Sequence, residues 1–368
     1  MSGGIGGVGF DGYGAGVAGA LLTDSATIRQ HLDTLLQQAG SGLLANTYAG
    51  LGNGAAMSLS LAPQIAAQTA WSKGIDAATG QMQVAQTALA QISSIASTFY
   101  ADTNNLNGLD PAQVDSTAQS ARQALQQVAG LLNSTDGGLY VFAGQDSGNP
   151  PIPNQNILAT GFFAQIQSAV AGLAGSGAPA VIAATLGIAG SNAPGTSPFS
   201  PALSQPAAGL QASLPTVATG PGQQTPFAIP ASANAFVAST GSSTTGSYAR
   251  DILRALATIG SLSSSQVNVG GFAAVVQDAH TSLGGAITAL NQDAGALGTI
   301  QSNLQAEQTG LGQTSTALTT QLGTVQDANM MQTLSQLTQT QTQLQASYQL
   351  LSGLSTYSLA KFLTPMMG

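Results

Sequence analysis

The sequence predicts a mainly α-helical protein, in which long antiparallel N- and C-terminal helices form a coiled-coil-like rod with an irregular, β-containing domain inserted in the middle. Two observations support this fold class. Apolar residues recur at seven-residue spacing near both ends of the chain, and the 103 consecutive residues 147–249 carry no charge. A 3.5-residue repeat makes a stripe too narrow for one helix to bury alone. We therefore expect each end of the chain to supply the partner helix of the other.

The two apolar repeats define the predicted helix seam. Toward the N-terminus, steps of four and three alternate from Trp71 to Phe99. Toward the C-terminus, steps of seven run from Leu297 to Val325 and, after a break in phase, from Met330 to Leu351. The candidate assembly residues on these repeats are Trp71, Ile75, Met82, Leu89, Ile92, Phe99, Leu297, Leu304, Leu311, Leu318, Val325, Met330, Leu337, Leu344 and Leu351.

The N-terminal part is expected to be only partly helical. Residues 1–20 are too rich in glycine to favour a helix, because each glycine costs about 1 kcal/mol relative to alanine. Thr23 or Asp24 can cap a short helix that ends at the glycines of residues 40–42. Residues 43–63 are expected to form a loop or a broken helix, and residues 64–104 the first long helix.

A second helix is predicted after the turn at residues 105–111, with Asp110 as its cap and Pro111 as its first residue. The run GLYVFAG at residues 138–144 indicates a short strand bounded by glycines. Helix resumes at residue 248 and, after a serine-rich turn, continues from about residue 272 almost to the C-terminus. The break in heptad phase at residues 327–329 predicts a boundary between two helical segments.

The middle of the chain has a different composition. Residues 147–249 contain 12 of the 15 prolines, and short apolar runs alternate with Gly, Ser and Pro. We expect a separate domain with short strands, two helical segments at residues 162–174 and 178–188, and mobile loops. The run of Ser and Thr at residues 239–245 is interpreted as a flexible hydrophilic loop, with acceptance of O-linked sugars as the alternative.

These elements predict three domains. Residues 1–60 with 328–368 form an inner domain of terminal helices, residues 61–146 with 250–327 form the helical rod, and residues 147–249 form the outer domain.

Composition argues against several classes of partner. The chain has 6 basic and 14 acidic residues, 5% of its length, where globular proteins carry about 25%. With a net charge of −8 and isolated basic residues, it lacks an electrostatic footprint for nucleic acid. It also lacks a basic amphipathic face for a membrane surface. Residues 169–190 are long enough to cross a bilayer, but they lack flanking charges and interfacial aromatic residues. We expect neither a nucleic-acid nor a membrane partner.

No motif predicts an enzyme, a cofactor or a metal site. Cysteine is absent, and His31 and His280 are the only histidines. Neither lies in a ligand-spaced cluster. Residues 4–9 fit G-x-G-x-x-G, but no strand precedes them. Asp110 and Asp115 could form an acid–base pair. A better explanation is that Asp110 caps a helix and that a carboxylate in the first turn of this helix interacts with the positive end of the helix dipole.

Several short motifs, in order along the chain, resemble the bacterial flagellin superfamily, which includes filament subunits and the hook-associated protein of the hook–filament junction. The resemblance covers roughly residues 23–145 and 250–363. The motifs are SGLL at 41–44, AGL at 49–51, AAMSL at 55–59, IDAATG at 75–80, QTALAQI at 86–92, ALGTIQSNL at 296–304, LQASY at 344–348 and SLAKFL at 358–363. The sequence departs from the family in its glycine-rich leader and at residues 51–54, where the family usually has acidic residues.

This resemblance implies a structural subunit of the flagellum that assembles into a helical tube through its terminal helices. It implies copies of itself and other flagellar axial proteins as partners, an export chaperone, and an extracellular location reached through the flagellar type III apparatus without a cleaved signal peptide. Residues 138–144 are more similar to the junction protein, but filament subunit and junction protein both remain open. The alternative from another class is a surface adhesin that binds carbohydrate through the middle domain.

Overall fold

The computed structural model describes residues 11–106 and 111–356. This part of the chain is mainly helical, which confirms the predicted fold class. Its α-helices are α1 (Asp11–Ser41), α2 (Gly54–Asn105), α3 (Pro111–Leu132), α4 (Gly161–Ala171), α5 (Leu173–Gly190), α6 (Ala207–Ala212), α7 (Tyr248–Gly260), α8 (Phe272–Gln326) and α9 (Met330–Thr356). Three short 3-10 helices are η1 (Tyr48–Leu51), η2 (Ile157–Ala159) and η3 (Ser264–Gln266).

The described strands form two small antiparallel hairpins. Strand β1 (Thr135–Asp136) pairs with β2 (Leu139–Tyr140), and β3 (Thr216–Gly220) pairs with β4 (Gln223–Pro226). The first hairpin turns at Gly137 and Gly138, whose φ angles of 55° and 85° favour glycine. The strand predicted at residues 138–144 is therefore shorter than expected, because the three residues after Tyr140 turn inward and are buried.

The chain divides into two compact units. Unit 1 comprises residues 1–67 and 314–368, and unit 2 comprises residues 68–313. Helices α2 and α8 contribute residues to both units. The division into three domains, with a separate domain at 147–249, stays a prediction.

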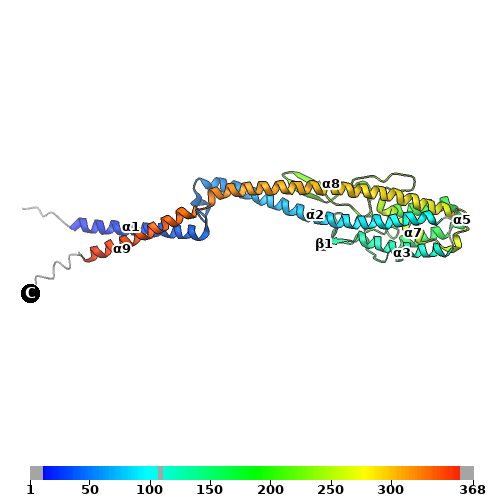
Figure 1. Cartoon of the computed structure of the whole chain (residues 1–368), viewed down its shortest axis with the longest axis horizontal. Helices are drawn as coiled ribbons and strands as arrows, with labels where there is room; N and C mark the ends of the chain where they lie inside the picture. Colours follow the sequence, from blue (N-terminus) through cyan, green and yellow to red (C-terminus); the bar gives the residue numbers. More distant parts are fainter. Residues whose placement is uncertain (1–10, 107–110, 357–368) are drawn as a thin grey trace, which may run out of the picture. The chain divides into compact units, whose positions relative to one another are not determined.

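Unit 1 is built on an antiparallel pair of helices, α1 and α9, which lie side by side in Figure 1. The chain segments at one end of this pair are joined by backbone hydrogen bonds. Leu44 N–H donates to the Gln326 carbonyl at 2.7 Å, and Ala328 N–H donates to the Gly42 carbonyl at 2.8 Å. Helix α8 ends at Gln326 and α9 begins at Met330, so the boundary predicted from the heptad break is confirmed.

The seam between α1 and α9 alternates small hydroxyl residues with leucine. On α1, Ser25 and Leu35 are buried. The seam positions of α9 follow a heptad pattern in which the hydroxyl residues are buried and the leucines are half-buried. These are Thr333, Leu337, Thr340, Leu344, Ser347 and Leu351. Small side chains let the two backbones approach, but they bury little apolar area, so the pair gains only modest stability from its own seam.

Two predictions for the N-terminal part are wrong. Helix α1 begins at Asp11, so neither Thr23 nor Asp24 is its cap. A loop or broken helix was expected at residues 43–63, but of these only residues 43–53 lie outside an α-helix, because helix α2 begins at Gly54 and continues through Pro63. Tertiary packing overrides propensity in both places. A Cβ on Gly54 would lie 2.3 Å from Val325 Cγ1, so glycine allows the first turn of α2 to lie against the end of α8.

Helix α3 begins at Pro111 as predicted, while its expected cap Asp110 lies outside the described residues.

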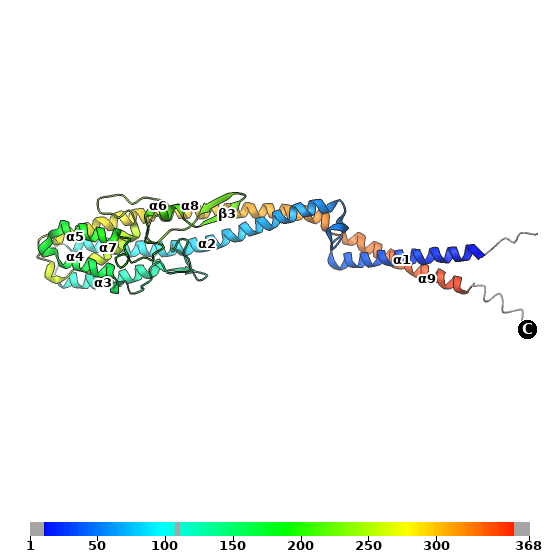
Figure 2. The same ribbon diagram turned by 180° about the vertical axis from the view of Figure 1, so that it is seen from behind.

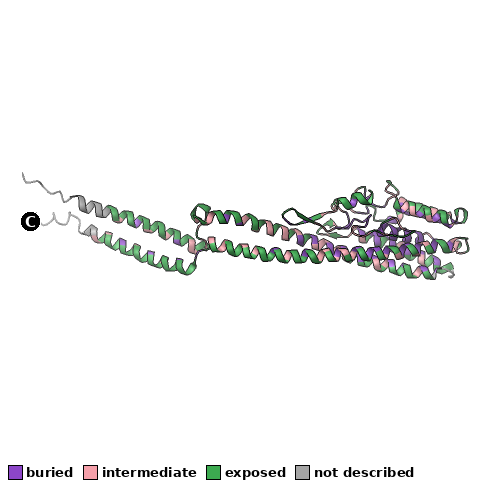
Figure 3. Cartoon of the chain, turned by 90° about the horizontal axis from the view of Figure 1, so that it is seen from above, coloured by how far each residue is buried: buried purple, intermediate pink, exposed green. Residues whose placement is uncertain are grey.

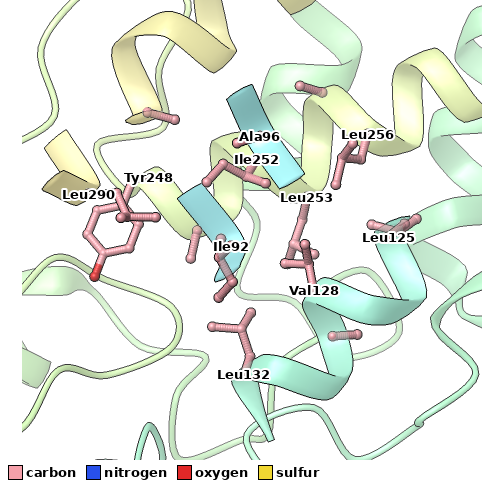
Figure 4. Close-up of a cluster of buried hydrophobic side chains, with 14 of the residues drawn as sticks. Ile92, Ala96, Leu125, Val128, Leu132, Tyr248, Ile252, Leu253, Leu256 and Leu290 are labelled. Carbon is pink, nitrogen blue, oxygen red and sulfur yellow. The ribbon is translucent and has the colours of Figure 1, made fainter. Parts of the chain in front are cut away.

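The core of unit 2 is centred on α7, all 13 residues of which are buried. Figure 4 shows labelled side chains of α2, α3, α7 and α8 meeting there. Ile92 of α2, Val128 of α3, Leu253 of α7 and Leu290 of α8 are each at most 1% exposed. Figure 3 shows the buried residues concentrated in this part of unit 2, whereas the helices of unit 1 are mostly exposed.

The uncharged segment 147–249 packs on the helices within unit 2. Helices α4 and α5 pack against each other and against α7, and the hairpin β3–β4 lies beside the long helices (Figure 2). A Cβ on Gly74 of α2 would lie 3.4 Å from Val217 of β3. The helices predicted at 162–174 and 178–188 correspond to α4 and α5.

The Ser/Thr run at 239–245 differs from the flexible loop that was expected. Ser243 is buried, and its hydroxyl donates to Asp278 Oδ1 at 2.6 Å. The hydroxyls of Thr244 and Thr245 donate to Asp251. Asp278 and Asp251, which follow later in the sequence, therefore anchor the last three residues of the run, while residues 240–242 are exposed.

Helix α5 has the length and apolar composition of a membrane-spanning helix. Its backbone is broken at Gly177, where φ is 76° and ψ is 162°. The straight part after this break, residues 178–190, is about 20 Å long at 1.5 Å per residue, which is short of the ~30 Å hydrocarbon core of a bilayer. Helix α5 packs against α4 and α7, and 28% of its residues are buried.

Candidate assembly surface

Most of the predicted seam residues on α2 and part of those on α8 lie together in the core of unit 2. Ile75, Met82, Leu89, Ile92 and Phe99 are at most 5% exposed, and Trp71 is half-buried against the same core. Leu297, Leu304 and Leu311 of α8 are buried in this core as well. Polar contacts between the two helices flank the stripes: Ser93 Oγ donates to Asn291 Oδ1 at 3.0 Å, and Gln308 Nε2 donates to Asp76 Oδ1.

The remaining seam residues belong to unit 1 and are less buried. Leu318 and Val325 are half-buried at the end of α8, and Leu337, Leu344 and Leu351 are half-buried along α9. Met330 is 40% exposed. The structure thus separates the predicted set into residues buried within one chain and residues that keep accessible apolar area. Their role in assembly stays a prediction.

Unit 1 also carries exposed apolar side chains, and all of them except Met330 were missed by the heptad analysis. Among the described residues, 13 large apolar side chains are exposed, and all but Tyr100 and Leu139 belong to unit 1. We call the remaining 11 the apolar surface of unit 1. They are Leu22, Leu36, Leu44, Tyr48, Met57, Leu59, Met330, Met331, Leu334, Tyr348 and Leu350. Met331 is 84% exposed, which is the largest fraction in this set.

Adjacent apolar pairs in the sequence could have revealed this surface. Such pairs are Leu21–Leu22, Leu35–Leu36, Leu43–Leu44, Met330–Met331 and Leu350–Leu351. Consecutive residues of a helix point about 100° apart, so a pair cannot fit one narrow stripe. In the two pairs on α1, for example, Leu35 is buried in the seam while Leu36 is 48% exposed, and Leu22 is 57% exposed beside half-buried Leu21.

Charge is sparse on unit 1. Its described side chains include only four charged groups, Asp24, Arg29, Asp33 and Asp327, all exposed. The guanidinium carbon of Arg29 lies 5.4 Å from the centroid of the Tyr348 ring, a cation–π contact between α1 and α9. A surface of this composition can be covered by another copy with little electrostatic repulsion and little desolvation of charge.

The most perturbed ionisable groups lie elsewhere, in the core of unit 2. Burial raises the pKa of Asp251, although hydrogen bonds from Thr244 and Thr245 oppose the shift. Burial likewise raises the pKa of Asp293, although hydrogen bonds from three backbone N–H groups and the Tyr248 hydroxyl oppose the shift. Tyr248 has its pKa raised well above the usual range by burial and by the charge of Asp293. Burial lowers the pKa of Arg250.

These perturbed groups lie in a packed core, and they bind backbone groups and hydroxyls of the same chain. Among the described residues, no group of three or more His, Cys, Asp or Glu side chains is arranged to hold a metal ion. Asp115 accepts a hydrogen bond from the Ser264 backbone N–H at 2.8 Å, which lowers its pKa and joins α3 to η3. His280 stacks on Tyr100, with ring centroids 4.0 Å apart.

Comparison with known proteins relates the C-terminal part of the chain to one family. No curated protein matches the chain. One family model matches residues 281–363, a segment that includes most of α8 and all of α9. This segment therefore contains the part of the apolar surface that extends from Met330 to Leu350. Over these residues the chain matches the family model of the bacterial flagellin C-terminal helical region.

Proposed function

We propose that this chain is a structural subunit of the bacterial flagellum that assembles with other copies through unit 1. The observation that carries the proposal is the apolar surface of unit 1, five members of which lie within the segment similar to flagellin. The concentration of exposed large apolar side chains in one unit favours an interaction site there. Contacts between different faces of identical subunits that do not close into a ring produce a helical filament.

The seam of α1 and α9 supports the same proposal. Its layers of Ser25, Thr333, Thr340 and Ser347 bury little apolar area within one chain. The exposed member of each apolar pair offers additional area to a neighbouring copy, so association would stabilise helices whose own pairing is weak. The buried residues of α2 and α8, such as Leu89 and Leu297, would hold unit 2 rigid in the assembly.

Seeded assembly tests the proposal and distinguishes its two forms. Purified full-length chain is mixed with short flagellar fragments and viewed by negative-stain electron microscopy. A filament subunit extends the fragments into long tubes, whereas a junction protein binds to their ends without elongation. Residues 138–144, which resemble the junction protein, favour the second form. Chain that stays monomeric and unbound would contradict both forms, and monomers with saturable glycan binding would favour an adhesin.

We further propose that the chain leaves the cell through the flagellar export apparatus, with its apolar surface covered by a chaperone beforehand. The apolar surface of unit 1 supports this, because free subunits would otherwise associate before export. The chain should be absent from the medium of cells that lack the apparatus and present in the medium of intact cells. Equal secretion by both would contradict the proposal.

A further inference from the structure

A quarter of the charged residues of this chain gather around α7. The sequence has 20 charged residues, and five of them are Arg250, Asp251, Arg254, Asp278 and Asp293. Four are at most 6% exposed, and the side chain of Asp278 is 13% exposed. Burying ionised groups is unfavourable unless each is paired or hydrogen-bonded, so the partners of these five groups show what the cluster holds in place.

Asp293 of α8 holds the end of the uncharged segment. Its carboxylate accepts the backbone N–H groups of Ala235, Phe236 and Val237 at 3.1, 2.7 and 3.1 Å. The Tyr248 hydroxyl adds a fourth hydrogen bond at 3.2 Å. Successive N–H groups that converge on one point form an anion-binding nest. Here the anion is a side chain of the same protein, more than 50 residues away in sequence.

The other four charges bind the same uncharged segment. Arg254 pairs with Asp278 at 2.9 Å, and both contact Ser243. Asp251 accepts the Thr245 N–H at 2.7 Å. Arg250 Nε donates to the Ser232 carbonyl at 2.8 Å, and its Nη1 donates to the Ala189 carbonyl at 2.9 Å. The partners of these charges in residues 147–249 are backbone groups, hydroxyls and the Asn192 amide, because this segment has no charge of its own.

We propose that these five charges form a latch that fixes residues 232–247 on the helices of unit 2, with Asp293 as its main positioning residue. Without the Asp293 carboxylate, three adjacent buried N–H groups lose their acceptor together. The apolar contacts among α4, α5 and α7 do not involve the Asp293 carboxylate. Loss of this carboxylate should therefore open residues 232–247 locally while the helical core stays folded. The inference concerns the docking of the uncharged segment and does not depend on the flagellar proposal.

Hydrogen–deuterium exchange of the full-length chain, read by mass spectrometry, tests the latch. In Asp293→Ala, peptides covering residues 232–247 should exchange at least tenfold faster, while peptides from α3 keep their wild-type rates. Asp293→Asn should give an intermediate change, because its amide retains one acceptor oxygen. Glu307→Ala, which removes an exposed carboxylate from the same helix, is the control and should leave residues 232–247 unchanged.

Two results would overturn the latch. Wild-type protection of residues 232–247 in both Asp293 variants would show that the carboxylate does not position them. Equal loss of protection throughout unit 2 would show a global core defect and no separate latch. If Asp293→Ala does not fold, the latch is tested with Asp293→Asn and Ser243→Ala. The second variant removes only the hydroxyl between Arg254 and Asp278. Ser243→Ala should speed exchange at residues 239–247 about threefold, and an unchanged rate in both variants refutes the proposal.

Discussion

Replacing Met331 and Leu334 by serine should weaken assembly without unfolding unit 2. Both side chains are on the apolar surface of unit 1, where they are 84% and 50% exposed. Complete burial of a Met or Leu side chain contributes about 1.5–3 kcal/mol. Scaled by the exposed fractions, the contributions still available to a neighbouring copy are roughly 1.3–2.5 and 0.8–1.5 kcal/mol. Their sum is about 2–4 kcal/mol per subunit.

A loss of this size should raise the critical concentration for seeded assembly about 30- to 700-fold, because 1.4 kcal/mol corresponds to a factor of ten. The critical concentration is measured from the protein that remains soluble after sedimentation of the assembled tubes. The matched control replaces Gln332 and Gln336, two exposed polar residues of the same helix, by serine. It has a similar cost in helix propensity but loses no apolar area. Equal critical concentrations for the two double variants would refute the reasoning.

Three further outcomes follow from the structure. Leu89→Ala, at a fully buried position of α2, should lower the free energy of unfolding by about 2–5 kcal/mol in urea titrations, and a loss below about 1 kcal/mol would contradict the core assignment. Asp293 has its pKa raised in the folded state, so its contribution to stability is fully present below the unfolded pKa and falls as pH rises through the folded value. The stability of wild type relative to Asp293→Asn should therefore decrease between pH 3 and pH 7 in urea titrations, and an increase would contradict the sign. Finally, the few charges on unit 1 predict that the critical concentration changes less than about threefold between ~50 and ~500 mM NaCl, and a steep salt dependence would show that charge governs assembly.

The long helices could be predicted because their signal is local and periodic. The seven-residue steps from Trp71 to Phe99 and from Leu297 to Leu311 mark faces that are buried in unit 2. The phase break near Asp327 marks the end of α8, since a change of register requires a new helical segment. These features depend on neighbouring residues along one helix, and a sequence displays them directly.

The beginnings of α1 and α2 could not be predicted from local propensity. The glycines between Asp11 and Gly19 disfavour an isolated helix, but α1 has a partner in α9. At Gly54 the absence of a side chain allows close approach to Val325, so a residue that weakens a helix also permits its packing. Such effects depend on a second segment more than 250 residues away.

The partners of the buried charged residues could not be predicted from sequence patterns either. Asp293 binds the backbone N–H groups of three residues whose side chains play no part in the contact. Backbone donors leave no signature in a sequence, so the Ser/Thr run at residues 239–245 was interpreted as a flexible loop. The apolar surface of unit 1 did leave a signature in paired residues such as Leu35–Leu36, but the heptad analysis considered only one face of each helix.

Protection of a single thiol on the apolar surface tests the central claim most directly. The chain contains no cysteine, so Met331→Cys introduces the only thiol, at a position that is 84% exposed in one chain. Ala180→Cys, on the exposed side of α5, is the control and should react with maleimide equally fast before and after assembly. If neighbouring copies cover unit 1, assembly should slow the labelling of Met331→Cys at least tenfold. Labelling at the same rate in free subunits and in assembled tubes would contradict the account.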